Sequence, residues 1–342
     1  MHVNIAIIGA GRMGTLHGIN FSKKVSNSRV VAVVDQNKEL SEKLSNELEA
    51  KAYSDIEHVL TLPELDAVCI STPIKTHKEF SLKALQAGKH VLCEKPLTLT
   101  VADAEEILQT VISSGCVFQL AFMRRFDDGF EAARQKIKQG AIGQPVFIRS
   151  SGRDPGLPPV PGWGSDPDAC GDISFELCSH DYDSMRWLME DEVKKVYAQA
   201  GILSSRDIAD KFGRMINDTI VISMEFERGA LGSVDGLLNI KYGYDARVEI
   251  VGDEGIILVG EIRHTDITWG GKSRVLSFPT SPSFVDRFSC AYIKEAQHFV
   301  DCIIDGKKPA VGIEDGLAAV KIAAAVNQSV RTGKATLINS GI

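Results

Sequence analysis

Apolar runs alternate with segments of helical periodicity along the first third of the chain. The runs have the length of buried strands and lie at residues 3–8, 29–34, 66–71, 89–93 and 117–121. The segments between them predict helices at 12–24, 38–49, 76–87 and 100–114. Such repeated strand–helix–strand units predict a parallel sheet with helices on both faces, and a ligand site beyond the carboxyl ends of the strands.

The rest of the chain has a different pattern. After a helix near 128–139 and a strand near 144–150, the proline-rich segment 154–172 reads as a loop, and we expect a helix at about 173–189. Period-two stretches between about 192 and 278, such as 219–226 and 230–238, predict an antiparallel sheet. Two late helices are expected near 289–305 and 314–332, separated by Gly306 and Pro309.

The length of 342 residues exceeds what one hydrophobic core usually organises. The change of pattern near residue 122 divides the chain into a first domain at 1–122 and a second at 123–342. The late helices are candidates to pack back on the first domain. A ligand then has room in a cleft between two domains.

A glycine-rich turn follows the first apolar run. Gly9, Gly11 and Gly14 form G-x-G-x-x-G, which permits a tight turn, close approach of the backbone to a pyrophosphate, and close helix–strand packing. The second run ends in Asp35, where a carboxylate can accept hydrogen bonds from ribose hydroxyls. Three glycines alone also occur in ordinary strand–turn–helix units, but the context favours a bound dinucleotide.

The residues after the second strand discriminate between the two nicotinamide dinucleotides. Asp35 would repel the additional phosphate of NADP, and no arginine stands at Gln36 or Asn37 to receive it. NAD is therefore the expected cofactor. NADP stays open because Lys38 lies close by.

The composition limits the classes of partner and the cellular location that we expect for this protein. The net charge of -7 argues against nucleic acid or an anionic membrane as a partner and favours a small molecule. The seven cysteines are odd in number and never spaced as C-x-x-C, which is unlike a disulfide framework or a zinc knuckle, so we expect reduced thiols. The amino terminus resembles no targeting signal and no apolar stretch reaches the length of a membrane span, so a cytoplasmic location is predicted.

Two clusters are candidates for catalysis. Glu94, Lys95 and Pro96 directly follow the strand at 89–93, where the nicotinamide end should arrive, and Lys95 suits proton exchange with a hydroxyl or carbonyl. Glu176, His180 and Asp183 have the spacing i, i+4, i+7, which predicts one face of one helix and an acid–base group. The alternative for Lys95 is an ordinary solvated lysine. The alternatives for the second cluster are a solvated stripe of a helix, or a zinc site, for which no further pair of ligands stands out in the sequence.

Weaker signals lie after two other strands. The run from Ser71 through Thr72 and Pro73 to His77 could line the dinucleotide, although a helix cap at Thr76 explains much of it equally well. Arg124 and Arg125 are candidates to contact phosphate or substrate, and surface charge is the alternative.

Taken together, these motifs resemble the Gfo/Idh/MocA oxidoreductase family. The resemblance rests on G-A-G-R-M-G at 9–14, S-T-P-x-x-x-H at 71–77, E-K-P at 94–96, F-M-R-R-F-D at 122–127, H-D-Y-D at 180–183 and R-F-x-x-A-Y at 287–292. Within the family, M-R-R-F-D and the residues from Gly152 to Pro155 are most similar to the inositol 2-dehydrogenases.

The resemblance implies an α/β fold: a Rossmann-type doubly wound parallel sheet, plus an α/β domain with an open, mostly antiparallel sheet that often forms dimers or tetramers. It implies catalysis by Lys95 and His180, assisted by Glu176, with Pro96 after a cis peptide bond. Cofactor contacts would come from Gly9, Gly11, Arg12, Met13, Gly14, Asp35, Thr72, Pro73, His77, Glu94, Lys95 and Arg124. Substrate contacts would come from Met123, Arg153, Asp183 and Tyr292.

The chain departs from the inositol dehydrogenases near the expected substrate pocket. Those enzymes usually carry aspartate four residues before the histidine, where this chain has Glu176, and Gly171-Asp172 stands where a glycine pair is common. We expect an NAD-dependent, homodimeric or homotetrameric dehydrogenase that oxidises a secondary hydroxyl of a cyclitol or sugar. The alternatives are an enzyme acting on a glycoside, nucleotide-linked sugar or sugar acid, and a non-catalytic dinucleotide sensor.

Overall fold

The computed structural model describes residues 2–159, 162, 166–213, 215–270, 272 and 274–338. The chain forms two compact units. The first combines residues 1–126 with 290–320, and the second combines 127–289 with 321–342. Part of the loop expected at 154–172 lies outside the described residues.

The sheet of the first unit is parallel throughout. Its strands are β1 (Val3–Ile8), β2 (Ser28–Val34), β3 (Lys51–Tyr53), β4 (Ala67–Ile70), β5 (His90–Cys93) and β6 (Phe118–Leu120). They lie in the order β3-β2-β1-β4-β5-β6, the order of a Rossmann fold. The predicted parallel sheet is confirmed, whereas the short edge strand β3 was not predicted.

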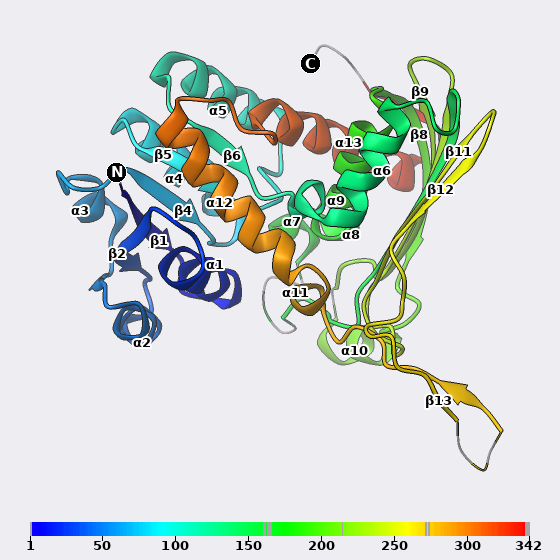
Figure 1. Ribbon diagram of the computed structural model, residues 1–342, viewed down its shortest axis with the longest axis horizontal. Coiled ribbons are helices and arrows are strands. Elements are labelled where there is room, and N and C mark those ends of the chain that lie inside the picture. Colours follow the sequence, from blue (N-terminus) through cyan, green and yellow to red (C-terminus); the bar gives the residue numbers. More distant parts are fainter. Residues whose placement is uncertain are drawn as a thin grey trace. The chain divides into compact units, whose positions relative to one another are not determined.

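Helices cover both faces of this sheet, as the alternating pattern predicts (Figure 1). They are α1 (Arg12–Lys23), α2 (Lys38–Leu48), α3 (Ile56–Leu60), η1 (Ile74–Thr76), α4 (His77–Gln86), α5 (Val101–Ser114), η2 (Met123–Phe126) and α12 (Ser289–Asp305). Local sequence sets several helix starts, since Asn37 caps α2 and Thr100 caps α5 through their side chains. The core between β1 and the helices includes Ile5, Phe21 and Phe299.

The second unit is built on a seven-stranded sheet. Its strands are β7 (Pro145–Arg153), β8 (Val193–Gly201), β9 (Thr219–Phe226), β10 (Leu231–Leu237), β11 (Asp245–Gly252), β12 (Ile256–Val259) and β15 (Thr336–Leu337). The order is β12-β11-β7-β10-β9-β8-β15, and only β7 and β10 pair in parallel. A mostly antiparallel sheet is thus confirmed.

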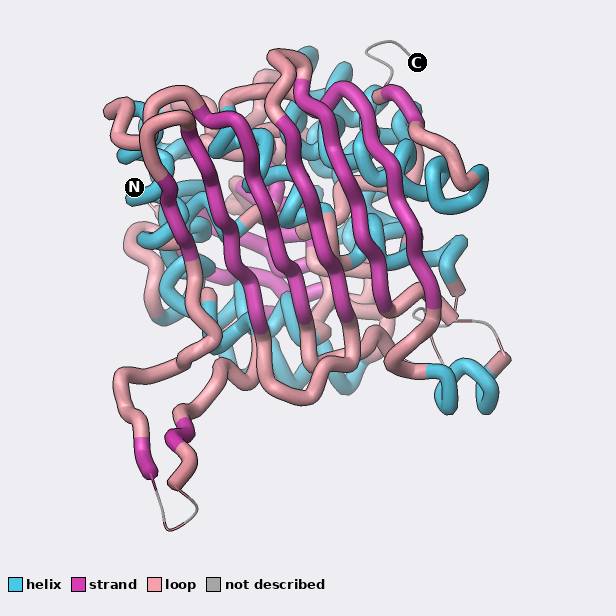
Figure 2. Tube along the Cα trace, turned by 90° about the vertical axis from the view of Figure 1, so that its right-hand side faces the viewer, coloured by secondary structure: helices cyan, strands magenta, loops and turns pink. Residues whose placement is uncertain are grey.

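One face of this sheet is uncovered within the second unit. Burial alternates along β9 and β10, so every second side chain faces the helices. In Figure 2, no helix of the described residues lies in front of these strands. A short hairpin, β13 (Trp269–Gly270) and β14 (Leu276–Ser277), extends beyond the sheet.

The helices of the second unit contain one correction. They are α6 (Asp128–Lys138), α7 (Pro167–Cys170), α8 (Asp172–Glu176), α9 (Ser179–Met189), α10 (Arg206–Phe212), α11 (Phe284–Arg287) and the latter part of α13 (Ile313–Thr332). The predicted single helix at 173–189 is wrong, because the helix is interrupted at Leu177 and Cys178, between α8 and α9. These two side chains pack on Gly236 of β10, where a Cβ would lie 2.7 Å from the Cys178 sulfur.

Two further features are the state of the cysteines and the lengths of the helices. All seven cysteines are free thiols. Among the helices of the described part, none combines the length and apolar character needed to cross a bilayer.

Candidate dinucleotide and active site

The glycine turn has the geometry that a dinucleotide requires. Gly9 adopts a φ of 96°, a conformation that favours glycine, and a Cβ there would lie 2.7 Å from the Ser71 carbonyl oxygen. A Cβ on Gly14 would lie 1.8 Å from the Gly9 carbonyl oxygen. Gly9 and Gly14 are therefore needed to close the turn itself.

The amino end of α1 is open toward a ligand. Gly11 occupies the cap position, no side chain caps the helix, and the first turn carries no acidic residue. A Cβ built on Gly11 would meet nothing within 4 Å, and both Gly11 and Arg12 are exposed. The backbone N–H groups and the helix dipole thus suit the pyrophosphate of a dinucleotide, and the residues present fit this group.

Asp35 is fixed at the carboxyl end of β2, beside the glycine turn. Its carboxylate accepts hydrogen bonds from the backbone N–H of Ala10 at 2.8 Å and of Asn37 at 2.8 Å. Each oxygen keeps a further lone pair for a ribose hydroxyl. The half-buried aspartate therefore fits the predicted contact with an adenosine ribose.

His77 connects the loops that follow β4 and β5. Its Nε2 lies 2.8 Å from the Thr72 carbonyl oxygen and its Nδ1 lies 2.8 Å from the Pro96 carbonyl oxygen. Burial lowers the pKa of His77, and a neutral imidazole has one N–H to donate to these two carbonyls. The side chain of Thr76 does not cap α4 but donates to the Thr72 hydroxyl, so the capping interpretation is wrong.

Glu94 is held at the end of β5 by a partner that the sequence did not reveal. Its Oε1 lies 2.7 Å from Nε2 of His17 in α1, and its Oε2 accepts a hydrogen bond from the Lys95 N–H. Burial raises the pKa of Glu94, but His17 and the charge of Lys95 outweigh burial and leave the pKa below its usual value. Because Glu94 is then anionic, His17 Nε2 carries the proton and donates it.

Lys95 follows directly, at the carboxyl end of the parallel sheet. Its side chain is half-buried, and the Lys95–Pro96 peptide bond is cis, as the family resemblance implies. This is the edge at which Rossmann folds bind their ligand.

Other predicted residues of the first unit are buried. Met123 and Arg124 lie in η2 and are each 1% exposed. Tyr292 lies in α12, where its ring contacts that of His17 edge-on with centroids 6.0 Å apart. Arg124 is thus not a surface charge.

His180 and Asp183 lie in α9 of the second unit and are both buried. Glu176 is half-buried and ends α8, so it does not share one helical face with them. The argument from i, i+4, i+7 spacing is therefore wrong for Glu176, although it holds for the turn that carries His180 and Asp183.

The helix that carries His180 is anchored to β7. The Ser150 hydroxyl donates to the Asp181 carboxylate at 2.6 Å, and both side chains are buried. A Cβ on Gly152 would lie 2.7 Å from an oxygen of Asp181. Ser150 and Gly152 thus face α9, whereas Ser151 and Arg153 point to the opposite face of the sheet.

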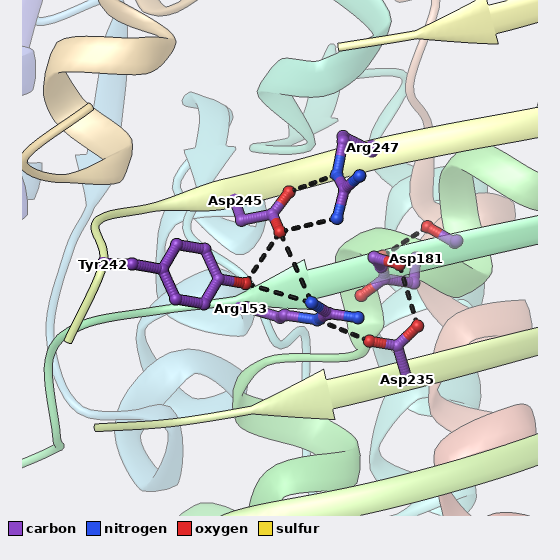
Figure 3. A network of polar contacts seen from close by, with 8 residues as sticks. Arg153, Asp181, Asp235, Tyr242, Asp245 and Arg247 are labelled. Carbon is purple, nitrogen blue, oxygen red and sulfur yellow. Dashed lines mark hydrogen bonds and ion pairs between the residues drawn. The ribbon is translucent and has the colours of Figure 1, made fainter. Parts of the chain in front are cut away.

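On that opposite face, Arg153 belongs to a polar network (Figure 3). Its guanidinium donates to Asp235 at 2.6 Å and to the Tyr242 hydroxyl at 3.0 Å. The Tyr242 hydroxyl donates to Asp245, which also accepts two hydrogen bonds from Arg247. The contacts of Arg153 are therefore with this network, and its predicted contact with substrate stays a prediction.

Sequence reasoning missed the polar residues of the first unit's core. His17 and Asn20 lie on the buried face of α1, and polar residues at positions i and i+3 of an apolar helix face were the available signal. Among the described residues, no group of His, Cys, Asp and Glu side chains could hold a metal ion.

The fold and the glycine turn define a dinucleotide-binding protein of the Rossmann class. A family model described as an oxidoreductase family with an NAD-binding Rossmann fold matches residues 3–122. The model of that family's C-terminal α/β domain matches residues 134–337. The chain belongs to the Gfo/Idh/MocA oxidoreductase family.

Individual relatives match along almost the entire chain. A scyllo-inositol 2-dehydrogenase (NAD(+)) of Bacillus subtilis is 34% identical over 97% of this chain and 95% of its own length. A myo-inositol 2-dehydrogenase of Thermotoga maritima is 33% identical over 96% of both chains. The structure of scyllo-inositol dehydrogenase from Lactobacillus casei with bound NAD(H) and scyllo-inositol is 28% identical, has a TM-score of 0.89, and covers 99% of both chains.

Proposed function

We propose that this protein is an NAD-dependent dehydrogenase that oxidises a secondary hydroxyl of a cyclitol, of the inositol type, to a ketone. The observation that carries the proposal is the full-length similarity to inositol dehydrogenases, which includes both units. The dinucleotide geometry of the first unit supports it independently, because the open amino end of α1 and the carboxylate of Asp35 fit NAD.

The first unit would hold the cofactor through its loops. The N–H groups at Gly11 and Arg12 would face the pyrophosphate, with Met13 beside them, and Asp35 would accept from the ribose. The loop of Thr72 and Pro73, tied by His77, would line the dinucleotide, with Glu94 and Arg124 near the nicotinamide end. When bound, NAD supplies the acceptor for the hydride, at carbon 4 of the nicotinamide ring.

The proton chemistry is assigned to Lys95 and His180. As the carbon loses hydride, one of them takes the hydroxyl proton and the other hydrogen-bonds the same oxygen. His180 is our choice for the acceptor, and Lys95 is the alternative. Glu176 would orient this pair from the end of α8, and Met123, Asp183 and Tyr292 would face the ring of the substrate.

The test is a substrate screen with the purified protein. Inositols, sugars, glycosides, nucleotide-linked sugars and sugar acids are each supplied with NAD and with NADP, and reduced-nicotinamide absorbance is followed. We expect the highest kcat/KM with an inositol and NAD. A higher kcat/KM with another substrate class would replace the cyclitol assignment, and NADH binding without oxidation of any compound would indicate a sensor.

Assembly and location are further parts of the proposal. We infer a homodimer or homotetramer that uses the uncovered face of the seven-stranded sheet, where Val221, Leu231 and Leu258 expose apolar side chains. The cytoplasmic location stays a prediction from the sequence.

A further inference from the structure

Glu295 is a buried carboxyl group that the proposed mechanism does not use. It lies in α12 and is 0% exposed, and neither carboxyl oxygen has a hydrogen-bond partner among the described residues. Its backbone carbonyl accepts a hydrogen bond from Gln119 of β6 at 3.0 Å. Because an unpaired buried carboxylate is strongly unfavourable, such a group calls for an explanation.

The face of α12 that carries Glu295 packs on α1. Ring contacts join Tyr292 to His17 and Phe299 to Phe21, with centroids 6.0 and 6.4 Å apart. Glu295 lies between Tyr292 and Phe299 along α12, and Asn20 lies between His17 and Phe21 along α1. The two polar residues therefore occupy the same level of the helix interface.

Further buried polar atoms in α1 and in β6, two elements that contact α12, have no partner among the described residues. They are the amide oxygen and nitrogen of Asn20, Nδ1 of His17 and the amide oxygen of Gln119. Buried polar atoms in folded proteins almost always find partners. Because these atoms make no direct hydrogen bond among the described residues, we expect ordered water to bridge them to one another and to Glu295.

The charges around Glu295 determine its ionisation. The charges of Glu94 at the end of β5 and of the Cys69 thiol in β4 interact with it, and His17 of α1 contacts Tyr292, which lies one turn before Glu295 on α12. Burial, and then the negative charge of Glu94, raise the pKa of Glu295 well above its usual value, whereas the pKa of Glu94 is lowered. The two carboxyl groups are therefore shifted in opposite directions, so that the buried environment favours the anionic form of Glu94 and the neutral form of Glu295.

We propose that Glu295 is a positioning residue for the candidate dinucleotide site, a neutral buried acid that orients His17 toward the Glu94 carboxylate. Through such water, a neutral acid can both donate toward and accept from the side-chain atoms of Asn20 and His17. An ionised Glu295 would instead repel Glu94 and compete with it for His17. The inference rests on the proposed function only where Glu94 is assigned to the cofactor site.

The neutral acid is tested by infrared spectroscopy of the full chain at neutral pH. We expect the carbonyl stretch of a neutral carboxylic acid in the wild type and its loss in Glu295→Gln. Glu79→Gln is the matched control, because Glu79 is paired with Lys83 on the surface of α4 and should leave the band unchanged. A band that is absent from the wild type, or unchanged in Glu295→Gln, would overturn the proposal.

Unfolding as a function of pH gives a second test without cofactor. Below the ordinary glutamate pKa of about 4.3, Glu295 is neutral in the folded and unfolded states, so its titration does not change the free energy of unfolding. As pH rises, only the unfolded state ionises, so the unfolding constant of the wild type should rise about tenfold per pH unit relative to Glu295→Gln. A ratio that does not change with pH would contradict a neutral Glu295.

The positioning role is tested by NADH binding. Glu295→Gln keeps a neutral polar group and should keep the Kd within about twofold, whereas Glu295→Leu, of similar size but apolar, should weaken binding about tenfold or more. If Glu295→Leu does not fold, Asn20→Leu takes its place. Wild-type affinity in the folded leucine variant would refute the positioning role. Loss of NADH binding by the wild type itself would instead refute the proposed function, and the infrared test would still decide the state of Glu295.

Discussion

Individual hydrogen bonds hold the short segment from Glu94 to Pro96, which carries the candidate catalytic Lys95. Glu94 is fixed by His17, and Pro96 is fixed through its carbonyl by His77, so the backbone on both sides of Lys95 is held. Lys95 itself is half-buried at the carboxyl end of β5. This arrangement suits a side chain that must meet a substrate at a defined position.

The first residue-scale prediction concerns the two proton-handling groups. Lys95→Ala and His180→Ala should each lower kcat by about 10²–10⁴-fold, because each removes a positioned acid–base group, while NADH still binds. Steady-state kinetics measures the change in kcat, and fluorescence titration measures the binding of NADH. The exposed Lys138→Ala and His58→Ala variants are the controls and should retain full activity. Intact turnover in either active-site variant would contradict the assignment.

A second residue-scale prediction concerns the choice of dinucleotide. Asp35→Asn keeps the shape of the side chain but removes the charge that repels the additional phosphate of NADP. The ratio of the Kd values for NADP and NAD should therefore fall about tenfold, equivalent to about 1.4 kcal/mol. Asp305→Asn, at an exposed site, should leave this ratio unchanged. An unchanged ratio in Asp35→Asn would show that Asp35 does not select NAD.

At the scale of elements, the amino end of α1 combines two different requirements for glycine. The fold itself requires glycine at position 14, because a Cβ there would overlap the carbonyl oxygen of Gly9. Gly11 has open space around its Cβ and is required only by a ligand that approaches the backbone.

This contrast gives the element-scale prediction. Gly14→Ala should destabilise the protein by about 1–3 kcal/mol, because the turn must shift to accept the methyl group. Gly11→Ala should leave the unfolding midpoint unchanged and weaken NADH binding at least about tenfold. Thermal unfolding and NADH titration of both variants separate the two effects. Normal NADH binding by Gly11→Ala would argue against a pyrophosphate at this helix end.

The helix break between α8 and α9 shows where element-scale prediction failed. Residues 173–189 have a helical pattern throughout, but the helix is interrupted at Leu177 and Cys178, whose side chains pack on Gly236 of β10. Since β10 lies about 60 residues further along the chain, local periodicity carries no information about this contact.

At the scale of the whole molecule, the uncovered sheet face requires an explanation. Val221, Leu231 and Leu258 are exposed there although apolar residues that stand out from a sheet are usually covered. A second copy of the chain is the cover that we propose.

The whole-molecule prediction tests this assembly. Leu258→Lys should shift the protein toward monomers in sedimentation velocity, because it places a charge on the proposed interface. Ile112→Lys is the matched control, since Ile112 in α5 is 66% exposed and Leu258 is 70% exposed. If both variants sediment like the wild type, the sheet face is not the interface.

The linear pattern of residues was sufficient to predict the parallel sheet, the glycine turn, Asp35 and the position of Lys95 after β5. These features depend on local periodicity and on motifs whose residues are neighbours in the chain. The three-dimensional structure was needed to find the His17–Glu94 pair, the burial of Glu295, the helix break before His180 and the network around Arg153. Each of these joins residues from different elements, and the free energy of such contacts depends on packing and burial, which a linear pattern does not encode.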